Sequence, residues 1–196
     1  MLKRRRTGFI SLLLLALGVA LALGFSAPTR IAAAPDAAGI SIQPGSLVVF
    51  AGQVFTVSLS ITGASNAGGY EATLFFNPAL LQVQEVTHPV PGFLAFNGRS
   101  DGAPSGAPLI NSAVGRITVA QYSYAAGNPA GAGGSGVLAH IRFKALAVGT
   151  SPLAFSTDPL YPLQLLDIQS NSLALTSLAG SVNIQPGKLF LPLIRR

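Results

Sequence analysis

The chain has 196 residues, no cysteine and a formal net charge of +6, so disulfide frameworks and thiolate metal sites are excluded. Most of the positive charge lies at the two ends, because residues 40–187 contain four basic and five acidic side chains, a net charge of −1. A nearly neutral domain of about 148 residues is long enough to bury one core, but it lacks the clustered Lys and Arg that nucleic-acid binding needs.

The amino-terminal segment has the layout of a secretory signal peptide. Residues 3–6 are Lys-Arg-Arg-Arg, and an apolar run of 17 residues from Phe9 to Phe25 precedes alanine-rich sequence. We expect residues 1–39 to be a signal peptide and an Ala/Pro-rich leader, with a secreted product that is extracellular or associated with the cell surface. If the segment were not cleaved, it would be a membrane anchor of the shortest length that spans a bilayer.

Short alternating segments follow the leader and predict β-strands. The first of them covers residues 40–43, is broken at Pro44-Gly45 and resumes over 47–50. From Val54 to Thr62 every second residue is apolar and the residues between are hydroxylated, so one face is expected to pack on the core.

A turn over 63–69 is expected to return the chain as a strand from Tyr70 to Phe76, which Asn77-Pro78 ends. Alternation places 72, 74 and 76 of this strand inward and 71, 73 and 75 outward. The next strand is expected over residues 81–86.

The second half of the chain predicts further strands separated by irregular connections. In the strand over 137–144, alternation points Val137 inward and Leu138 outward. The other expected strands are 108–112, 116–124, 153–156 and 173–184, while 88–107, 125–136 and 158–171 are expected to be loops.

The strand pattern predicts an all-β domain. Eight or nine short strands, with turns every 8 to 12 residues and no capped helical period, are typical of an antiparallel sandwich or jelly roll. We therefore expect one domain over residues 40–187, followed by an apolar and basic tail over 188–196. The tail could act in envelope retention or sorting, or as an extended peptide added to a sheet edge.

An ordered set of motifs resembles the cohesin family over roughly residues 40–184. The motifs are Gly52-Gln53-Val54-Phe55-Thr56-Val57, the run from Tyr70 to Leu81, Gly115-Arg116-Ile117, the strand over 136–144 and Gly180-Ser181-Val182. The resemblance implies a nine-stranded antiparallel β-sandwich with jelly-roll topology, related in fold to carbohydrate-binding modules. It also implies a non-catalytic module that binds dockerin modules of secreted proteins.

The resemblance also implies where a partner binds, across the sheet that contains strands 70–76 and 116–124. By alternation the partner-binding residues are Glu71, Thr73, Phe75, Arg116, Thr118 and Tyr122. No cofactor or metal is expected on this chain, since calcium would belong to the dockerin. Cohesins commonly have Asp-Pro where this chain has Asn77-Pro78, so a charge that contributes to partner binding is absent. Alternatively, a loop covers Phe75, and the two charged side chains are simply solvated.

Two other functions remain open from the sequence. Tyr122 and Tyr124 share a strand face and could form a small carbohydrate-binding platform for a polysaccharide, although sugar-binding faces usually present coplanar rings and the chain has no Trp. The same tyrosines could be ordinary residues at a sheet edge. A structural or adhesive module at the cell surface is the third possibility.

Catalysis is not expected. A nucleophilic hydrolase needs Ser, His and a carboxylate within reach of one another, and only His88 and His140 are available. Neither histidine has a supporting motif, and both are expected at the solvated surface. We therefore predict no catalytic residue and no metal site.

Overall fold

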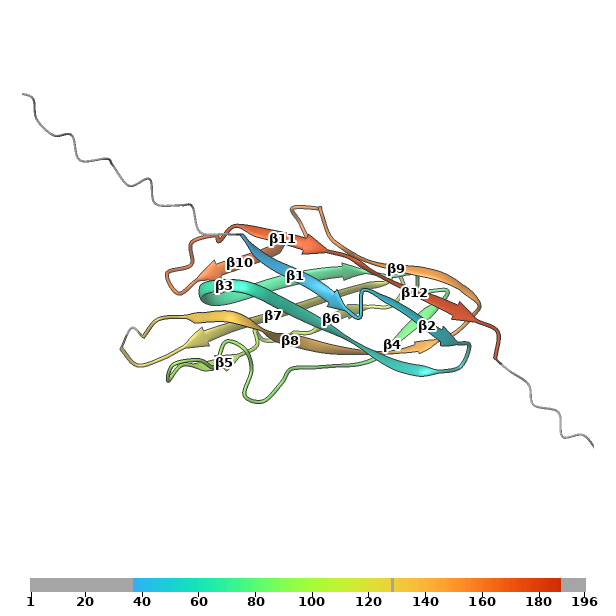
Figure 1. Ribbon diagram of the computed structural model, residues 1–196, viewed down its shortest axis with the longest axis horizontal. Coiled ribbons are helices and arrows are strands. Elements are labelled where there is room, and N and C mark those ends of the chain that lie inside the picture. Colours follow the sequence, from blue (N-terminus) through green and yellow to red (C-terminus); the bar gives the residue numbers. More distant parts are fainter. Residues whose placement is uncertain (1–36, 128, 188–196) are drawn as a thin grey trace, which may run out of the picture. The chain divides into compact units, whose positions relative to one another are not determined.

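The computed structural model describes residues 37–127 and 129–187, which form twelve β-strands and no helix (Figure 1). The strands are β1 (Ala38–Gln43), β2 (Ser46–Phe50), β3 (Val54–Phe75), β4 (Leu81–Thr87), β5 (Ser100–Gly102), β6 (Leu109–Asn111), β7 (Arg116–Tyr124), β8 (Ala132–Ala145), β9 (Gly149–Phe155), β10 (Leu163–Asp167), β11 (Leu175–Leu178) and β12 (Gly180–Gln185). In this part of the chain no helix is long and apolar enough to cross a membrane. Residues 1–36 of the predicted leader and the carboxyl-terminal tail lie outside the described residues, whereas Ala38 and Gly39 belong to β1.

The 22-residue strand β3 contributes to two layers of a sandwich. Its first half pairs with β1 and β8, and its second half pairs with β7 and β10. Between the halves, Gly63 and Asn66 have positive φ angles of 65° and 57°, a conformation that glycine and asparagine adopt most readily. Figure 1 shows β3 turning back at this point, so the turn predicted over 63–69 exists as a corner inside one continuous strand.

The first layer has the strand order β11-β1-β3-β8-β4 and uses the first half of β3. The second layer has β10 on one side of the second half of β3 and β7 on the other, and β5 and β6 pair with β7. Strand β12 pairs with β2 and β9, and β9 also meets the end of β3. The pairs β1-β11 and β2-β12 are parallel and the remaining strand pairs are antiparallel. The predicted all-β sandwich is confirmed.

The strand count differs from the expected eight or nine because two predicted segments are divided, two predicted strands join in β3 and two further short strands form. Pro44 and Gly45 separate β1 from β2, and Ala179 separates β11 from β12. Two short strands, β5 and β10, lie in segments that were expected to be loops. Strand β10 has only five residues, and its partner is β3, more than 80 positions away in the sequence. Such a short strand depends on its partner more than on its own pattern.

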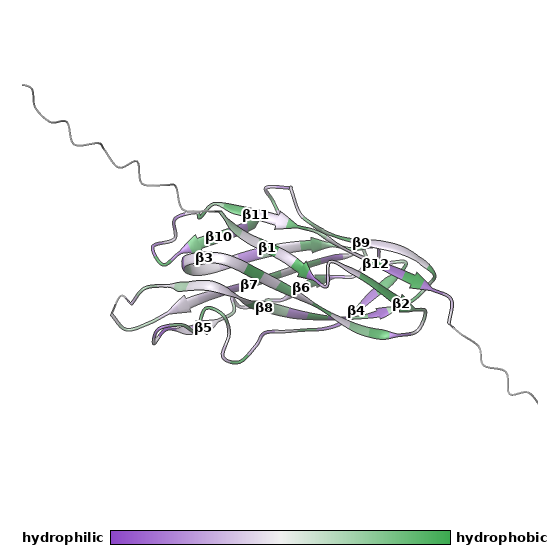
Figure 2. Cartoon of the chain, in the orientation of Figure 1, coloured by the Kyte–Doolittle hydropathy of each residue, from purple (hydrophilic) through white to green (hydrophobic). Residues whose placement is uncertain are grey.

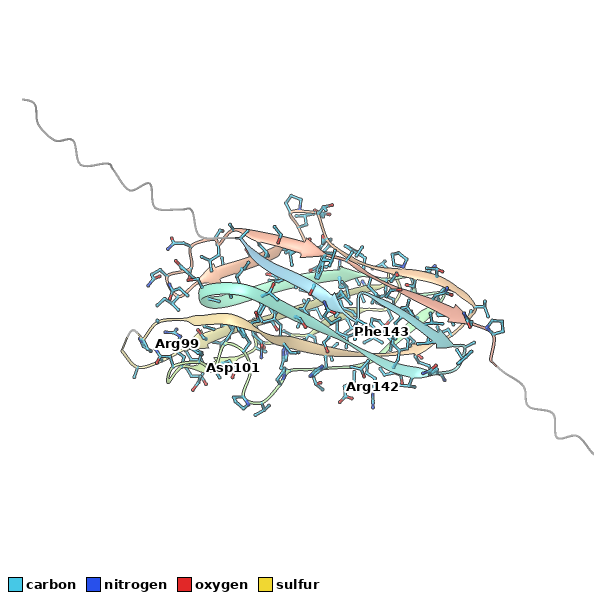
Figure 3. The ribbon with its side chains drawn as sticks, in the orientation of Figure 1. Arg99, Asp101, Arg142 and Phe143 are labelled. Carbon is cyan, nitrogen blue, oxygen red and sulfur yellow. The ribbon has the colours of Figure 1, made fainter. Side chains whose placement is uncertain are left out.

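Side chains from both layers fill the core. The alternation predicted for the first half of β3 is confirmed, since Phe55, Val57, Leu59 and Ile61 are buried. Phe143 of β8 is fully buried, stacks on Phe55 at a centroid distance of 5.8 Å, and meets Phe76 edge-on at 5.3 Å. Figure 3 shows Phe143 inside the sandwich and Arg142 projecting away from it, and Figure 2 shows hydrophobic stretches alternating with paler or hydrophilic ones along the strands.

The predicted orientations of Val137 and Leu138 were wrong. A β-bulge lies at Leu138, because Leu59 pairs with Ala139 and the next residue, Ser60, pairs with Val137. One extra residue in β8 reverses the alternation on the amino-terminal side of the bulge. Leu138 is therefore fully buried, while Val137 lies beside Ser60 and is half-buried.

Replacing Phe143 with Ala should lower the free energy of unfolding by about 3–5 kcal/mol, because the change leaves a cavity between Phe55 and Phe76. Urea denaturation of the full chain measures the change. The neighbouring variant Lys144→Ala removes an exposed side chain and should stay within about 0.5 kcal/mol of the wild type. Equal effects at the two positions would contradict this account of the core.

Gly115→Ala should destabilise the domain more than Gly63→Ala, although both residues have a φ of 65°. At Gly63 an added Cβ meets nothing within 4 Å, so only the backbone strain of about 1–2 kcal/mol remains. At Gly115 the Cβ would overlap the backbone carbonyl oxygen of Phe76. A backbone atom cannot move aside through a change of side-chain rotamer. Thermal unfolding of both variants tests the difference, and a smaller loss for Gly115→Ala would show that the start of β7 is not held in this conformation.

Candidate functional site

The residues predicted to bind a partner lie on one face of the second layer. Buried residues such as Leu74 and Ile117 point into the core, so their neighbours on β3 and β7 point outward. The outward residues form cross-strand pairs: Phe75 with Arg116, Thr73 with Thr118, Glu71 with Ala120, and Gly69 with Tyr122. We call this surface the outer face. The structure therefore brings the six predicted residues together.

Residues on the flanking strands extend the outer face. Beside β3, Ala154 of β9 pairs with Phe75, and Gln164 of β10 pairs with Glu71. Beside β7, Leu109 of β6 pairs with Thr118. Leu109 is largely exposed, and its place on this face could not be found from the sequence because the register of the segment 88–113 has no clear pattern.

The centre of the outer face is buried, contrary to the expectation that Thr73 and Thr118 face solvent. The exposed fraction is 0% for Thr73 and 9% for Thr118, and their Oγ1 atoms lie 2.8 Å apart in a hydrogen bond. Either hydroxyl can donate to the other, so each is satisfied without water. These two side chains offer a partner almost no accessible surface in this arrangement.

The two charged residues of the outer face interact within the chain. The Arg116 guanidinium lies over the ring of Tyr161, with its Cζ atom 3.8 Å from the ring centroid, which is a cation–π contact. Gln164 Nε2 donates to Glu71 Oε2 at 3.3 Å. Both charged residues are half-buried, as is Phe75. The place of Tyr161 on this face could not be found from the sequence, because Tyr161 belongs to a connection with no periodic pattern.

Tyr122 and Tyr124 are exposed on the outer face, with 47% and 55% of their surface accessible. Their rings are 6.0 Å apart and inclined by 44°, which differs from the coplanar arrangement of a sugar-binding platform. Gly102 of β5 lies against them, since an added Cβ there would come within 3.3 Å of the Tyr122 ring. The pair is therefore a compact aromatic edge next to β5.

A buried polar cluster lies beneath the same end of the sheet, on the inner side. The Tyr70 hydroxyl lies 3.1 Å from Leu138 O and 3.2 Å from Gln121 Oε1, and it can donate to either. Burial, and secondly the nearby carboxylate of Asp101, raise the pKa of Tyr70 far above its ordinary value. This tyrosine stays protonated and serves as a structural donor.

His88 belongs to this cluster, so its predicted position at the solvated surface was wrong. Its Nδ1 atom lies 3.1 Å from Leu138 O and donates to it when protonated. Its Nε2 atom is buried and has no hydrogen-bond partner among the described residues. The bulge at Leu138 supplies the carbonyl that both His88 and Tyr70 use.

Arg99 and Asp101 hold the segment around β5 against β7 (Figure 3). Arg99 donates through Nε to Ser123 Oγ at 2.9 Å and through a terminal nitrogen to Pro129 O at 3.0 Å. Gln121 Nε2 donates to Asp101 Oδ2 at 3.4 Å. These contacts are structural, and they keep β5 beside the exposed tyrosines.

His140 lies on the opposite surface of the sandwich, on the outer side of the first layer. Its Nδ1 atom is 3.0 Å from Ser58 Oγ across β3 and β8. On the same two-strand edge, Arg142 of β8 and Glu85 of β4 form an ion pair with a nitrogen–oxygen distance of 3.2 Å. In the described ranges no group of three His, Cys, Asp or Glu side chains is arranged to hold a metal ion.

Asn77 keeps the turn after β3 although it carries no charge. Its Oδ1 atom accepts a hydrogen bond from Ala79 N at 3.0 Å, and its carbonyl accepts from Leu81 N at 3.0 Å. An aspartate would make the same turn. The turn chemistry is thus independent of the charge that the sequence lacks.

Comparisons with known proteins agree with this architecture. No match was found among curated proteins. A cohesin domain from the cellulosome of Acetivibrio cellulolyticus, of type II, has a TM-score of 0.55 at 18% identity, covering 75% of this chain and 95% of its own. A non-cellulosomal cohesin from the archaeon Archaeoglobus fulgidus has a TM-score of 0.52 at 18% identity, covering 76% and 91%. A cohesin–dockerin complex from Clostridium thermocellum gives 0.56 at 12% identity, covering 76% and 94%.

These solved structures show the fold, since all three have low sequence identity to the chain. The family profile is more specific, because residues 40–184 match the cohesin domain. That range begins within β1 and ends within β12, so it includes both layers and the outer face. The chain therefore belongs to the cohesin family.

Proposed function

We propose that this protein is a secreted, non-catalytic recognition module that binds a dockerin on an extracellular partner. The observation that carries the proposal is the match to the cohesin domain over residues 40–184. Several solved structures with the same fold are described as cohesin–dockerin complexes. Cohesin domains are binding modules rather than enzymes, and we assign no catalytic residue.

We further propose a three-part organisation. Residues 1–39 would contain a signal peptide that directs export and is cleaved ahead of β1, residues 40–187 would be the binding domain, with Ala38 and Gly39 at the start of its first strand, and residues 188–196 would be a tail with a separate role. The basic and apolar layout of the leader supports the first assignment. Export without any cysteine is compatible with a domain whose stability comes from its packed core.

The outer face is the proposed contact surface. Tyr122 is its most exposed predicted residue, and the largely exposed Leu109 lies on the neighbouring strand. Aromatic residues with adjacent apolar groups are enriched at the centres of protein interfaces. Glu71, Phe75 and Arg116 would contribute at the side where β9 and β10 flank the sheet. Because Glu71 and Arg116 already have partners within the chain, we assign the larger share of affinity to the aromatic edge.

The full chain should capture a dockerin-containing protein from the secreted proteins of its own organism, and calcium chelation should abolish capture, since a dockerin folds around its own calcium. Mass spectrometry of the captured proteins, with and without chelator, is the measurement. Capture that survives chelation, or recovery of no dockerin in either sample, would contradict the proposal. In that event polysaccharide binding is the next assay, although the inclined tyrosine rings argue against it.

Tyr122→Ala should weaken dockerin binding at least about tenfold, as expected for an aromatic side chain near the centre of an interface. Lys144→Ala is the matched control, because Lys144 is exposed on the outer side of the first layer and should leave the affinity unchanged. Isothermal titration calorimetry with the captured dockerin gives both values. An unchanged affinity for Tyr122→Ala together with a loss for Lys144→Ala would place the contact on the other layer.

A further inference from the structure

The connection between β9 and β10 leaves β3 and returns to it at almost the same place. Ser156, directly after β9, donates its backbone N–H to Thr73 O at 2.9 Å. Leu163, the first residue of β10, pairs with Ala72, the residue next to Thr73. Two adjacent positions of β3 are therefore joined by six intervening residues, 157–162. These six residues are far more than the gap requires, so they form a loop that bulges away from β3.

The connection projects on the side of the outer face. Tyr161 belongs to it, and the Tyr161 ring contacts the Arg116 guanidinium at 3.8 Å. Arg116 lies on β7, which borders β3 on the side opposite to β9 and β10. In the ladder Phe75 lies between Ala154 of β9 and Arg116. The contact between Arg116 and Tyr161 therefore spans β3 on its outer side.

The connection has a defined local structure. Ser156 Oγ accepts a hydrogen bond from Asp158 N at 3.1 Å, and Asp158 Oδ1 accepts from Leu160 N at 2.9 Å. Tyr161 N donates to the Asp158 carbonyl at 2.9 Å, which closes a tight turn. Pro159 and Pro162 restrict the backbone further. Leu160 projects from the tip of this turn with 80% of its surface exposed.

The buried residues of the outer face lie beside this connection, and its exposed residues lie further away. Thr73 and Thr118, which lie next to the closed segment, are 0% and 9% exposed. Tyr122, two cross-strand pairs further along β7, is 47% exposed. Hydroxyl side chains on the outward side of a two-layer sandwich normally face water. A cover over this part of the sheet accounts for their burial.

We propose that residues 157–162 form a cover over the outer face, held shut by the contact between Arg116 and Tyr161, and that the cover limits how much of the face a partner can reach. When it is closed, the exposed surface is the edge with Tyr122 and Leu109. When it opens, Thr73, Phe75 and Thr118 join the contact surface. The existence of the cover is independent of the proposed function, whereas its effect on a dockerin rests on that function.

A thiol-labelling experiment tests the cover without any partner. The chain contains no cysteine, so Thr118→Cys creates a single thiol beneath the proposed cover. Its reaction with a maleimide in the folded full chain should be slow. Adding Tyr161→Ala removes one cation–π contact, which should raise the labelling rate about two- to fivefold. Replacing residues 157–162 with Gly-Gly should raise it further, because the whole cover is then absent.

Tyr122→Cys is the matched control, since that position is exposed and lies outside the covered region. It should react rapidly in all three backgrounds. Urea denaturation of each variant establishes that labelling reports on the folded state, and if the Gly-Gly variant does not fold, the Tyr161→Ala comparison decides. Equal labelling of Thr118→Cys with and without Tyr161 would overturn the cover.

Dockerin binding provides the second arm. Tyr161→Ala should speed association, because a larger fraction of the molecules presents the open face. Faster labelling with an unchanged association rate would overturn the role of the cover in binding. Faster labelling with no dockerin bound by any form, wild type included, would contradict the proposed function and leave the cover itself established.

Discussion

The passage of β3 from one layer to the other is the constraint on which the rest of the structure depends. The first half of the strand organises β1 and β8, and the second half organises β7, β9 and β10. The register of both layers is thereby set by one continuous backbone, so the position of the core in the first layer fixes which side chains of the second layer point outward. The outer face is a direct product of the corner at Gly63 and Asn66.

The outer face satisfies most of its own polar groups. The two threonines bond to each other, Glu71 accepts from Gln164, and Arg116 lies on Tyr161. Each of these pairs would have to be maintained or exchanged when a partner removes water from the surface, because an unpaired buried polar group is costly. The exposed tyrosines can present their ring surfaces without breaking any of these pairs. This difference divides the face into a part that is ready for contact and a part that must rearrange.

Local pattern was enough to predict the all-β fold and many of the strands. Residues 54–62 alternate without interruption, and their buried and exposed sides are as expected. The burial of Leu138 could not be predicted, because a bulge depends on how two strands pair and the sequence of one strand does not reveal it. The burial of Thr73 and Thr118 could not be predicted for a similar reason, since the covering residues lie some 40 or more positions later in the chain. The predicted site was therefore right in its place on the sheet and incomplete in its accessibility.

The parallel pairing of the first and last strands determines how the domain responds to mechanical load. Strands β1 and β2 lie beside β11 and β12 and run in the same direction, so the start of the first strand and the end of the last are at opposite ends of the pairing (Figure 1). Tension between these two points would load the interstrand hydrogen bonds in shear, all at once, instead of opening them one by one. Such loading makes the domain harder to extend than one whose first and last strands are antiparallel neighbours.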